Sequence, residues 1–277
     1  MSLPPTIRLN GVEIGAPSLT VIAGPCLAES LDLCLSVAER MQTLCADLNL
    51  QYIFKASFDK ANRSSVHSPR GAGMDEGLNI LTAVHDRLGL PVTTDMHLPD
   101  QALAVSQAVD LIQIPAFLCR QSDLLAAAAA TGVPVNVKKG QFLSPMDAKN
   151  IVEKLEGFGA TSAMLTERGT TFGYSGLVVD MTAFQIMKGF GVPVCFDATH
   201  SAQMPGAGSS TTGGRRDAIP ALARAATAAG IDAIFLEVHP DPANALSDAA
   251  TQWPLNRAEW LLRQVAQIHA MTRSIVA

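Results

Sequence analysis

Short apolar runs and longer amphipathic segments alternate along most of the chain. The apolar runs, most of which contain β-branched residues, occupy residues 19–26, 51–57, 91–97, 111–117, 134–140, 162–168, 193–200 and 233–239. The other segments have the apolar spacing or alanine content of helices and occupy residues 30–48, 75–88, 100–109, 122–131, 145–158, 179–190, 216–229 and 257–273. Strands that alternate with helices pair in parallel through right-handed crossovers, so the pattern indicates the α/β class. Eight such units predict a closed (β/α)8 TIM barrel.

A different pattern precedes the first of these strands. Apolar residues alternate from Ile7 to Ile14 on either side of Asn10-Gly11, and Asn-Gly between alternating runs is the strongest short-range signal for a β-hairpin. We therefore expect an N-terminal hairpin at about residues 6–15, placed as a plug or lid on one end of the barrel. No linker or low-complexity segment divides the sequence, so residues 1–277 are expected to form one domain.

An open, doubly wound sheet is the alternative arrangement of the same elements. Its dinucleotide-binding form carries Gly-x-Gly-x-x-Gly after the first strand, and this chain has no such motif there. Hydrophobic residues make up 48% of the chain and aromatic residues only 5%, which suits an α/β core of small and branched side chains. The closed barrel remains the predicted fold.

Charge and cysteine content narrow the class of partner. The net charge is -5 and the basic residues form no continuous stripe, so we expect small-molecule partners and no nucleic acid. The most apolar later segment, residues 124–137, is interrupted by Gly132 and Pro134 and is too short for a bilayer, so no membrane association is expected. Five cysteines without paired spacing indicate reduced thiols, and no secretory signal begins the chain, so we expect a cytoplasmic protein.

The end of the second predicted strand and the loop after it are rich in cations and hydrogen-bond donors. The donors are Lys55, Ser57, Lys60, Asn62, Arg63 and Ser64. Such groups bind carboxylate or phosphate oxygens through charge-assisted hydrogen bonds, which are roughly twice as strong as neutral ones. A solvated basic loop is the alternative, because most charge clusters lie on the surface. The composition of the loop favours an anion-binding site.

Polar residues also occupy one alternation class near the ends of the other predicted strands. If Lys55 points into the barrel, side-chain alternation places the following residues inside it as well: Cys26, Asp95, Gln113, Asn136, Lys138, Arg168 and Glu237. A barrel interior without a binding site would be filled by apolar side chains such as Val, Ile and Leu at these positions. Burying so many charges without a ligand costs several kcal/mol per ion, so the set predicts a preformed site for charged substrates.

A second group of residues has the chemistry of a metal site. Cys26 ends the first strand, His200 ends the seventh, Glu237 lies in the eighth and Asp248 follows in the next loop. A thiolate, an imidazole and two carboxylates suit a divalent ion such as Zn, Fe or Mn. Two alternatives remain open from composition alone. In the first, Cys26 is only a small buried hydrophobe, as lone cysteines more often are. In the second, His239, His97 or Asp197 takes one of the ligand positions.

Six motifs are long enough to compare with known enzymes. They are Ala-Gly-Pro-Cys-Leu-Ala-Glu-Ser from Ala23, Phe-Lys-Ala-Ser-Phe-Asp-Lys-Ala-Asn-Arg-Ser-Ser from Phe54, Gln-Ile-Pro-Ala-Phe-Leu-Cys-Arg-Gln from Gln113, Asn-Val-Lys-Lys-Gly-Gln-Phe from Asn136, Thr-Glu-Arg-Gly from Thr166 and Phe-Asp-Ala-Thr-His-Ser from Phe196. Together they resemble the 3-deoxy-D-manno-octulosonate 8-phosphate synthase family, from about Ile7 to Leu255. The resemblance implies a (β/α)8 transferase that condenses phosphoenolpyruvate with D-arabinose 5-phosphate and supplies Kdo for lipopolysaccharide.

The resemblance also implies roles for individual residues. Lys55, Ser57 and Lys60 would hold the carboxylate end of phosphoenolpyruvate, and Gln113, Lys138 and Arg168 its phosphate. Asn62, Arg63 and Ser64 would bind the sugar phosphate, and Arg120 would reach it from a neighbouring subunit, because the family is tetrameric. Asp95 and Asn136 complete the candidate substrate-binding residues. The candidate catalytic residues are Lys55, Lys60, Lys138, His200 and Asp248.

The family has metal-dependent members with Cys in the Gly-Pro-Cys position and metal-independent members with Asn there. Cys26 and the Ala-Leu-Ser-Asp-Ala segment around Asp248 resemble the metal-dependent branch. This resemblance implies a divalent ion held by Cys26, His200, Glu237 and Asp248, with its identity among Zn, Fe and Mn left open.

Other functions fit parts of the same pattern. A related condensing enzyme, DAHP synthase, uses erythrose 4-phosphate, but its substrate loop normally reads Pro-Arg-Thr-Ser where this chain has Ala-Asn-Arg-Ser-Ser. A sialic acid synthase would need a further C-terminal domain. A Schiff-base aldolase would use Lys55 or Lys138 as the nucleophile. A non-catalytic phosphosugar sensor would have the same anion contacts but no need for Cys26 near His200.

Overall fold

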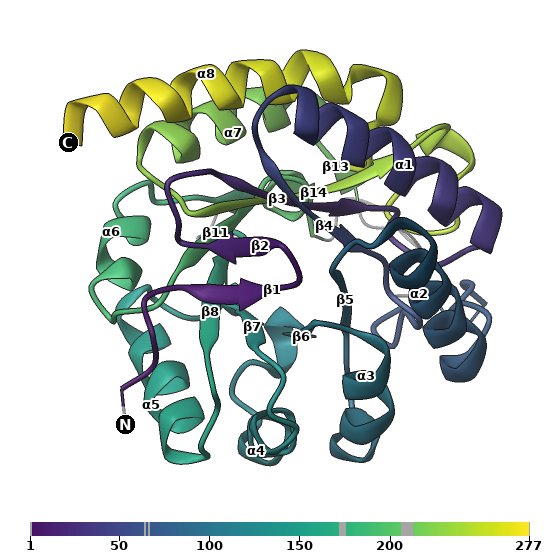
Figure 1. Ribbon diagram of the computed structural model, residues 1–277, viewed down its shortest axis with the longest axis horizontal. Coiled ribbons are helices and arrows are strands. Elements are labelled where there is room, and N and C mark those ends of the chain that lie inside the picture. Colours follow the sequence, from purple (N-terminus) through teal and green to yellow (C-terminus); the bar gives the residue numbers. More distant parts are fainter. Residues whose placement is uncertain (1, 64, 66, 172–175, 206–212, 277) are drawn as a thin grey trace.

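The computed structural model describes residues 2–276 apart from residues 64, 66, 172–175 and 206–212. Parallel strands form a closed barrel, with helices around its outside (Figure 1). In order around the cylinder the barrel strands are β3 (Thr20–Gly24), β4 (Gln51–Lys55), β5 (Val92–Asp95), β6 (Leu111–Ile114), β7 (Val135–Lys138), β8 (Ala163–Glu167), β11 (Val194–Asp197) and β14 (Ala233–His239). Because β14 pairs in parallel with both β3 and β11, the sheet closes. The predicted (β/α)8 barrel is confirmed, and the open sheet is excluded.

The outer layer consists of helices that follow the barrel strands. They are α1 (Leu31–Asp47), α2 (Met74–Leu88), α3 (Ala102–Ala108), α4 (Ser122–Ala130), α5 (Lys149–Gly157), α6 (Ala183–Lys188), α7 (Ile219–Ala228) and α8 (Ala258–Val276). The prediction of a helix over residues 179–190 was too long. Asp180 forms a turn there, in which its side chain accepts hydrogen bonds from the backbone N–H and the hydroxyl of Thr182, so α6 begins only at Ala183.

Further short strands lie between and after the barrel elements in the described part of the chain. They are β9 (Thr170–Thr171), β10 (Leu177–Val178), β12 (Gln203–Met204), β13 (Gly213–Gly214) and β15 (Trp253–Pro254). The first four form two antiparallel pairs, whereas β15 extends the sheet beside the end of β14. None of these pairs was predicted, because two-residue strands carry no measurable alternation.

Two apolar clusters confirm which side of each strand faces inward. Residues such as Val21, Phe54 and Val137 belong to the large cluster that includes the helices. The side chains on the other face of the strands form a smaller cluster with the N-terminal hairpin, and they include Ile22, Ile53, Leu111, Met164, Cys195 and Phe235. Two residues further along their strands, Lys55 on β4, Gln113 on β6 and Glu237 on β14 lie on this same inner face. The predicted polar residues therefore point into the barrel, beyond its inner apolar layer.

The N-terminal hairpin closes the end of the barrel at which the strands begin. Strands β1 (Ile7–Leu9) and β2 (Val12–Ile14) pair in antiparallel register, which confirms the predicted hairpin. Ile7 and Ile14 are fully buried against the inner apolar cluster, and in Figure 1 the hairpin lies in front of the barrel strands. The hairpin is thus a plug at the N-terminal ends of the strands, and the carboxyl ends remain available for a site.

Candidate active site at the carboxyl end of the barrel

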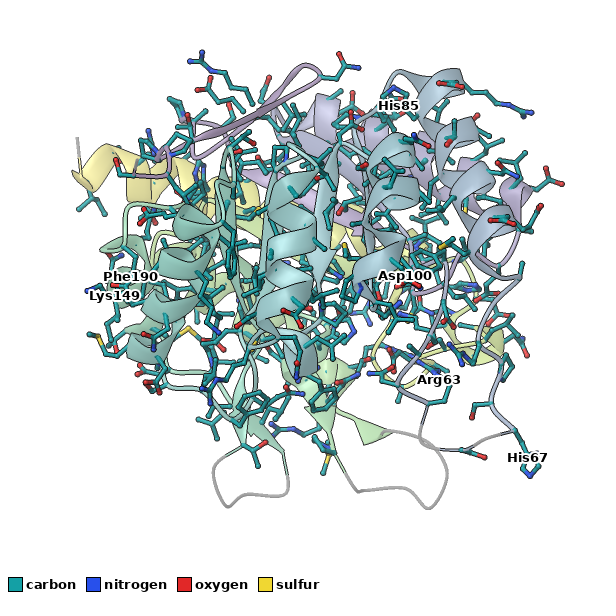
Figure 2. All side chains as sticks on the ribbon, turned by 90° about the horizontal axis from the view of Figure 1, so that it is seen from below. Arg63, His67, His85, Asp100, Lys149 and Phe190 are labelled. Carbon is teal, nitrogen blue, oxygen red and sulfur yellow. The ribbon has the colours of Figure 1, made fainter. Side chains whose placement is uncertain are left out.

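A cavity of about 790 Å³ opens at the carboxyl ends of the strands. In Figure 2, which views the barrel from the side, Arg63 lies at this end, away from His85. Of the candidate site residues, those that line the cavity are Lys55, Ser57, Lys60, Asn62, Arg63, Asp95, Gln113, Lys138, Arg168, His200, Glu237 and Asp248. Residues that lie far apart in sequence are thus brought to one mouth of the barrel.

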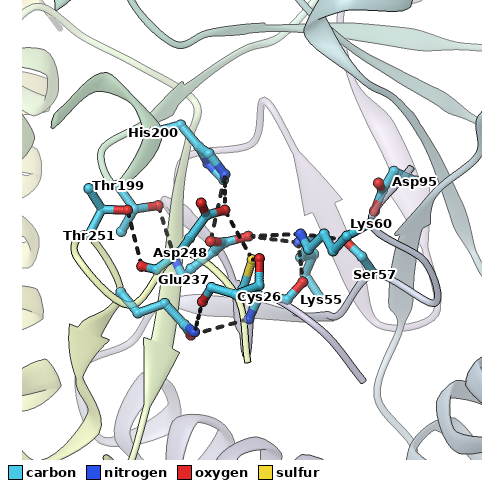
Figure 3. A network of polar contacts seen from close by, with 12 residues as sticks. Cys26, Lys55, Ser57, Lys60, Asp95, Thr199, His200, Glu237, Asp248 and Thr251 are labelled. Atoms are coloured by element: carbon cyan, nitrogen blue, oxygen red, sulfur yellow. Dashed lines mark hydrogen bonds and ion pairs between the residues drawn. The ribbon is translucent and has the colours of Figure 1, made fainter. Parts of the chain in front are cut away.

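Two lysines form one wall of the cavity and share a carboxylate. Lys55 Nζ donates to Glu237 Oε1 at 2.9 Å and to the Cys26 carbonyl at 3.3 Å. Lys60 Nζ donates to Ser57 Oγ at 3.0 Å and lies 3.8 Å from the same Glu237 oxygen. Figure 3 shows both ammonium groups directed toward Glu237. Each ammonium group has three N–H donors and uses only some of them in these contacts, so both lysines keep donor capacity toward an anionic ligand in the cavity.

Strand β3 approaches this wall so closely that only glycine fits at its last position, Gly24. A Cβ atom at Gly24 would lie 2.0 Å from the Lys55 carbonyl oxygen, a distance that no side chain tolerates. Gly24 therefore permits the neighbouring ends of β3 and β4 to carry Cys26 and Lys55 side by side.

Lys138 also lines the cavity and is paired with a different carboxylate. Its Nζ donates to Asp197 Oδ2 at 2.6 Å and lies 3.7 Å from the centre of the Phe235 ring. The same Asp197 oxygen lies 2.7 Å from His200 Nδ1. Burial raises the pKa of Asp197, but His200 and Lys138 outweigh this effect and hold the pKa well below its usual value. Asp197 is therefore a buried carboxylate shared between a cation of the cavity and a histidine.

Several buried polar atoms beside the cavity have no hydrogen-bond partner among the described residues. They include Arg168 Nη1, Gln113 Oε1, Asp95 Oδ1 and Gln141 Oε1. The other terminal nitrogen of Arg168 donates to Gln203 Oε1 at 2.7 Å, which fixes the guanidinium in place. Buried polar groups in native proteins are rarely left unpaired, so these atoms are suited to a polar ligand.

The four candidate metal ligands also converge. One ligand atom each from Cys26, Glu237 and Asp248 lie within 4.8 Å of one another. His200 Nε2 lies 3.6 Å from Glu237 Oε2 and 3.7 Å from Asp248 Oδ2, and Figure 3 shows its ring directed at both carboxylates. Glu237 Oε2 is buried and has no hydrogen-bond partner in the described part of the chain. A soft thiolate, an imidazole and two carboxylates of this arrangement fit one divalent ion.

Burial affects the pKa values of the candidate metal ligands Cys26 and Glu237. Burial, followed by the charge of Glu237, raises the pKa of the Cys26 thiol well above its ordinary value, so without a bound cation the thiol keeps its proton. Burial also raises the pKa of Glu237, but Lys55, His200 and Lys60 outweigh it, and the pKa falls to about 2. Because metal ligands must be deprotonated, binding of an ion at Cys26 would release a proton.

The loop that carries Asp248 is tied to Cys26 by a buried glutamine. Gln252 accepts a hydrogen bond from the Cys26 backbone N–H at 3.2 Å and donates to the Ser247 carbonyl at 2.8 Å. Its own backbone N–H donates to the Asp248 carbonyl at 3.0 Å. Asp248 has a φ of +47°, a left-handed conformation that a side chain rarely adopts without such support. These bonds hold two candidate ligands together although they are far apart in sequence.

Three predicted site residues do not line the cavity, and one cannot be placed. Cys26 lies behind the wall, and Asn136 is buried below it, where its Oδ1 accepts a hydrogen bond from Thr166 Oγ1 at 2.7 Å. Arg120 is exposed on the outer surface, outside the cavity of its own chain. Ser64 lies outside the described residues.

The structure adds residues that the sequence analysis did not assign to a role. Gln203 connects Arg168 to Asp248, to whose Oδ1 its Nε2 donates at 3.4 Å, and His97 Nε2 lies 3.0 Å from Asp95 Oδ2. His97 and Asp197 were considered only as alternative metal ligands. For Asp197, the spacing of three residues before His200 was the one signal that pointed to the contact observed.

Comparison with protein families decides the relationship. The family model described as the DAHP synthetase I family matches residues 6–274. The chain belongs to the DAHP synthetase I family.

Within the DAHP synthetase I family, similar proteins carry a more specific name. A protein of Trichlorobacter lovleyi named 2-dehydro-3-deoxyphosphooctonate aldolase is 50% identical over 268 residues, which cover 96% of this chain and 98% of the relative. Proteins of the same name from Cyanothece sp. and Aromatoleum aromaticum are 52% and 49% identical, over 90% and 97% of this chain and 91% and 97% of their own lengths. The resemblance seen in the motifs is thereby confirmed, because 2-dehydro-3-deoxyphosphooctonate is a synonym of the sugar acid phosphate in that family's name.

Proposed function

We propose that this chain is a transferase that condenses phosphoenolpyruvate with D-arabinose 5-phosphate and water, giving 3-deoxy-D-manno-octulosonate 8-phosphate and inorganic phosphate. One observation carries the proposal: relatives about 50% identical over nearly the whole chain are named for this sugar acid phosphate. The cavity supports it, because cations and donors for two anionic groups lie on different parts of its wall.

The charges of the cavity suggest how the first substrate is held. Lys55 and Lys60, with Ser57, are placed to bind the carboxylate end of phosphoenolpyruvate. Lys138 and Arg168, with Gln113, are placed to bind its phosphate, and the Arg168 Nη1 atom, unpaired within the described chain, supplies a free donor. Charge-assisted bonds at both ends would fix the direction of the enol between them.

The second substrate is proposed to enter past the loop after β4. Asn62 and Arg63 line the outer part of the cavity and supply donors for the phosphate of the pentose. Ser64 belongs to the same proposal from sequence alone. Asp95, whose Oδ1 has no partner among described residues, is placed to accept a hydrogen bond from a sugar hydroxyl.

Holding both anions in one cavity brings the reacting carbons together. The enol C3 attacks the aldehyde carbon of the pentose, hydroxide from water adds at C2, and the remaining proton of the water goes to the former aldehyde oxygen. The C2–O bond to phosphate then breaks, the C2 hydroxyl gives up its proton to the departing phosphate, and a ketone is left at C2. Positioning two reactants in this way contributes up to several kcal/mol, about 7 to 11 in the best intramolecular cases. The buried lysines also neutralise the phosphate that leaves.

We further propose that Cys26, His200, Glu237 and Asp248 hold a divalent ion, with Zn, Fe and Mn as candidates. Such an ion polarises a carbonyl or a water molecule when bound. The residues of this chain prepare its site. Asp197 orients the His200 ring through Nδ1, and Gln252 holds the Cys26 and Asp248 segments together.

One set of assays tests the activity and the metal together. Phosphate release from phosphoenolpyruvate is measured with D-arabinose 5-phosphate and, as the rival aldose, with erythrose 4-phosphate. We expect kcat/KM at least 100-fold higher with arabinose 5-phosphate, because the Asn62–Arg63 segment departs from the Pro-Arg-Thr-Ser form of erythrose-using relatives. A preference for erythrose 4-phosphate would assign the chain to the rival activity.

The same assay is repeated after chelation with EDTA and gel filtration. Loss of phosphate release and its recovery on titration with Mn²⁺, Zn²⁺ or Fe²⁺ are the expected results. Full activity in a preparation shown by elemental analysis to contain no transition metal would refute the metal site.

The finer assignments of partner and location are proposals as well. We propose a cytoplasmic homotetramer in which Arg120 of one subunit completes the sugar-phosphate site of the next, in the supply of Kdo for lipopolysaccharide. The exposed position of Arg120, outside its own cavity, supports this arrangement. No helix in the described ranges has the length and apolar character needed to cross a membrane. Light scattering that gave the mass of a 29.1 kDa monomer would refute the tetramer.

A further inference from the structure

Asp197 occupies an unusual position at the end of β11. It is fully buried and does not line the cavity, so it has no direct access to a substrate. Its Oδ2 atom accepts from Lys138 Nζ at 2.6 Å and lies 2.7 Å from His200 Nδ1. Its Oδ1 atom accepts from the His200 backbone N–H at 2.9 Å and from Thr199 Oγ1 at 3.1 Å. One carboxylate oxygen therefore serves two residues that belong to different parts of the site.

The contact at Nδ1 fixes how His200 presents its other nitrogen. With Nδ1–H donating to Asp197, Nε2 carries a lone pair and lies toward Glu237 and Asp248, at 3.6 and 3.7 Å from their oxygens. A carboxylate behind a histidine ligand also raises the basicity of the ligating nitrogen. The strength of the Asp197–His200 contact therefore affects how well His200 binds a cation.

Lys138 and His200 compete for the same oxygen atom, Oδ2 of Asp197. Asp197 is the only carboxylate that pairs with Lys138 among the residues the structure describes, and the lysine also faces the cavity. An anion that approaches Lys138 from the cavity takes over part of its hydrogen bonding. The shared oxygen is then left more fully to His200, which strengthens the contact at Nδ1.

We infer that Asp197 is a positioning residue that couples the phosphate-binding Lys138 to the metal-binding His200, so that phosphoenolpyruvate and the divalent ion each tighten the binding of the other. This inference rests on the proposed function, because it takes Lys138 as a contact of the phosphate and His200 as a ligand. Coupling between two sites is reciprocal, so it can be measured from either side as a ratio of affinities.

The test measures the affinity of the purified protein for Mn²⁺ by competition with a chelator, without and with saturating phosphoenolpyruvate. For the native protein we expect phosphoenolpyruvate to tighten Mn²⁺ binding by at least about fivefold, the lower end of typical coupling. In Asp197→Asn, which keeps the shape but weakens the acceptor, we expect the ratio to fall below about twofold. A folded Asp197→Asn protein with the native ratio would overturn the inference.

A matched control makes the same chemical change at Asp232, a carboxylate outside β11 that contacts the other end of this strand. Asp232 Oδ2 accepts from the Val194 N–H where β11 begins, and Oδ1 pairs with Lys188 at 2.8 Å. Asp232→Asn is expected to keep the native ratio. If Asp232→Asn also abolished the effect of phosphoenolpyruvate on Mn²⁺ affinity, the cause would be a general disturbance of β11. That result would overturn the assignment to Asp197.

A second variant keeps the test decisive if Asp197→Asn does not fold. Lys138→Gln leaves Asp197 and His200 in place and removes the link to the cavity, so saturating phosphoenolpyruvate should no longer change the Mn²⁺ affinity. Retained coupling in Lys138→Gln would overturn the inference.

The native measurements also separate failure of the inference from failure of the proposed function. Native protein that binds both ligands independently refutes the coupling and leaves the proposed function standing. Native protein that binds neither ligand refutes the proposed function, and the inference with it.

Discussion

Arg168 illustrates how single side chains at the mouth of the barrel are held ready for a ligand. Its guanidinium is buried, one terminal nitrogen is fixed by Gln203, and the other has no partner within the described residues. Burial lowers the pKa of Arg168, and the charges of Asp197 and Asp248 partly offset this effect. A guanidinium remains charged after such a shift, so the free nitrogen is a strong donor for phosphate oxygens.

Replacement of Arg168 tests this role directly. We expect Arg168→Ala to raise the KM for phosphoenolpyruvate about 10- to 100-fold, because a hydrogen bond to a charged group contributes roughly 1.5–3 kcal/mol. The steady-state rate of phosphate release at varied phosphoenolpyruvate provides the measurement. Arg70→Ala is the matched control, since Arg70 is exposed and, among the described residues, forms an ion pair with Asp59 alone. An unchanged KM in Arg168→Ala, or an equal rise in both variants, would contradict the proposed contact.

Residue identity at these positions was predictable, whereas the contacts between them were not. Side-chain alternation placed Lys55, Gln113 and Glu237 inside the barrel, and the structure agrees. The contact between Lys138 and Asp197 joins β7 and β11, which are not neighbours in the sheet because β8 lies between them. Such a contact depends on curvature and rotamers across the barrel interior, and alternation along a single strand carries no information about either.

At the scale of secondary structure, α1 is held to the barrel by a buried face that contains two thiols. Cys34 and Cys45 belong to the large apolar cluster and are free of disulfide bonds. Burial raises the pKa of each thiol to about 12. An unfolded cysteine has a pKa of about 8.5, so above that pH the unfolded chain loses protons that the folded helix keeps.

The sign of this difference predicts a loss of stability in alkali. Because the folded pKa is raised, the contribution of each thiol is fully present below about pH 8.5 and is lost as the pH rises toward 12. At pH 10 the loss is about 2 kcal/mol per thiol, from 1.36 kcal/mol for each pH unit. Urea unfolding of the metal-free protein at pH 8 and pH 10 measures it. Cys34→Ala should lose about 2 kcal/mol less than the native protein between these pH values, and an identical loss in both proteins would refute the account.

The limits of the elements were predicted less well than their existence. The hairpin was recognisable because Asn10-Gly11 fixes its turn, and the strands because their apolar runs are separated by helical segments. The loop from Ala245 to Gln252 had no such pattern. Its shape depends on the Gln252 contacts and on the left-handed backbone of Asp248, which involve a partner far away in sequence. Its role in placing Asp248 was therefore visible only in the structure.

At the scale of the whole molecule, the two ends of the barrel have different tasks. The hairpin and the inner apolar layer fill the N-terminal end, so the charged residues are carried on a packed base. The carboxyl end combines a cation-lined cavity with a cluster of metal-type ligands, and Glu237 and Asp197 connect the two. If the proposed function is right, a divalent ion and phosphoenolpyruvate bind next to each other in this one cavity.

A crystal structure with Mn²⁺ and phosphoenolpyruvate, in which anomalous scattering locates the ion, tests this expectation most directly. We predict that the phosphate of phosphoenolpyruvate contacts Lys138 and Arg168. We predict one ion in the same cavity, bound by Cys26, His200, Glu237 and Asp248. An ion held by other residues, or phosphoenolpyruvate bound away from the carboxyl ends of the strands, would contradict the account.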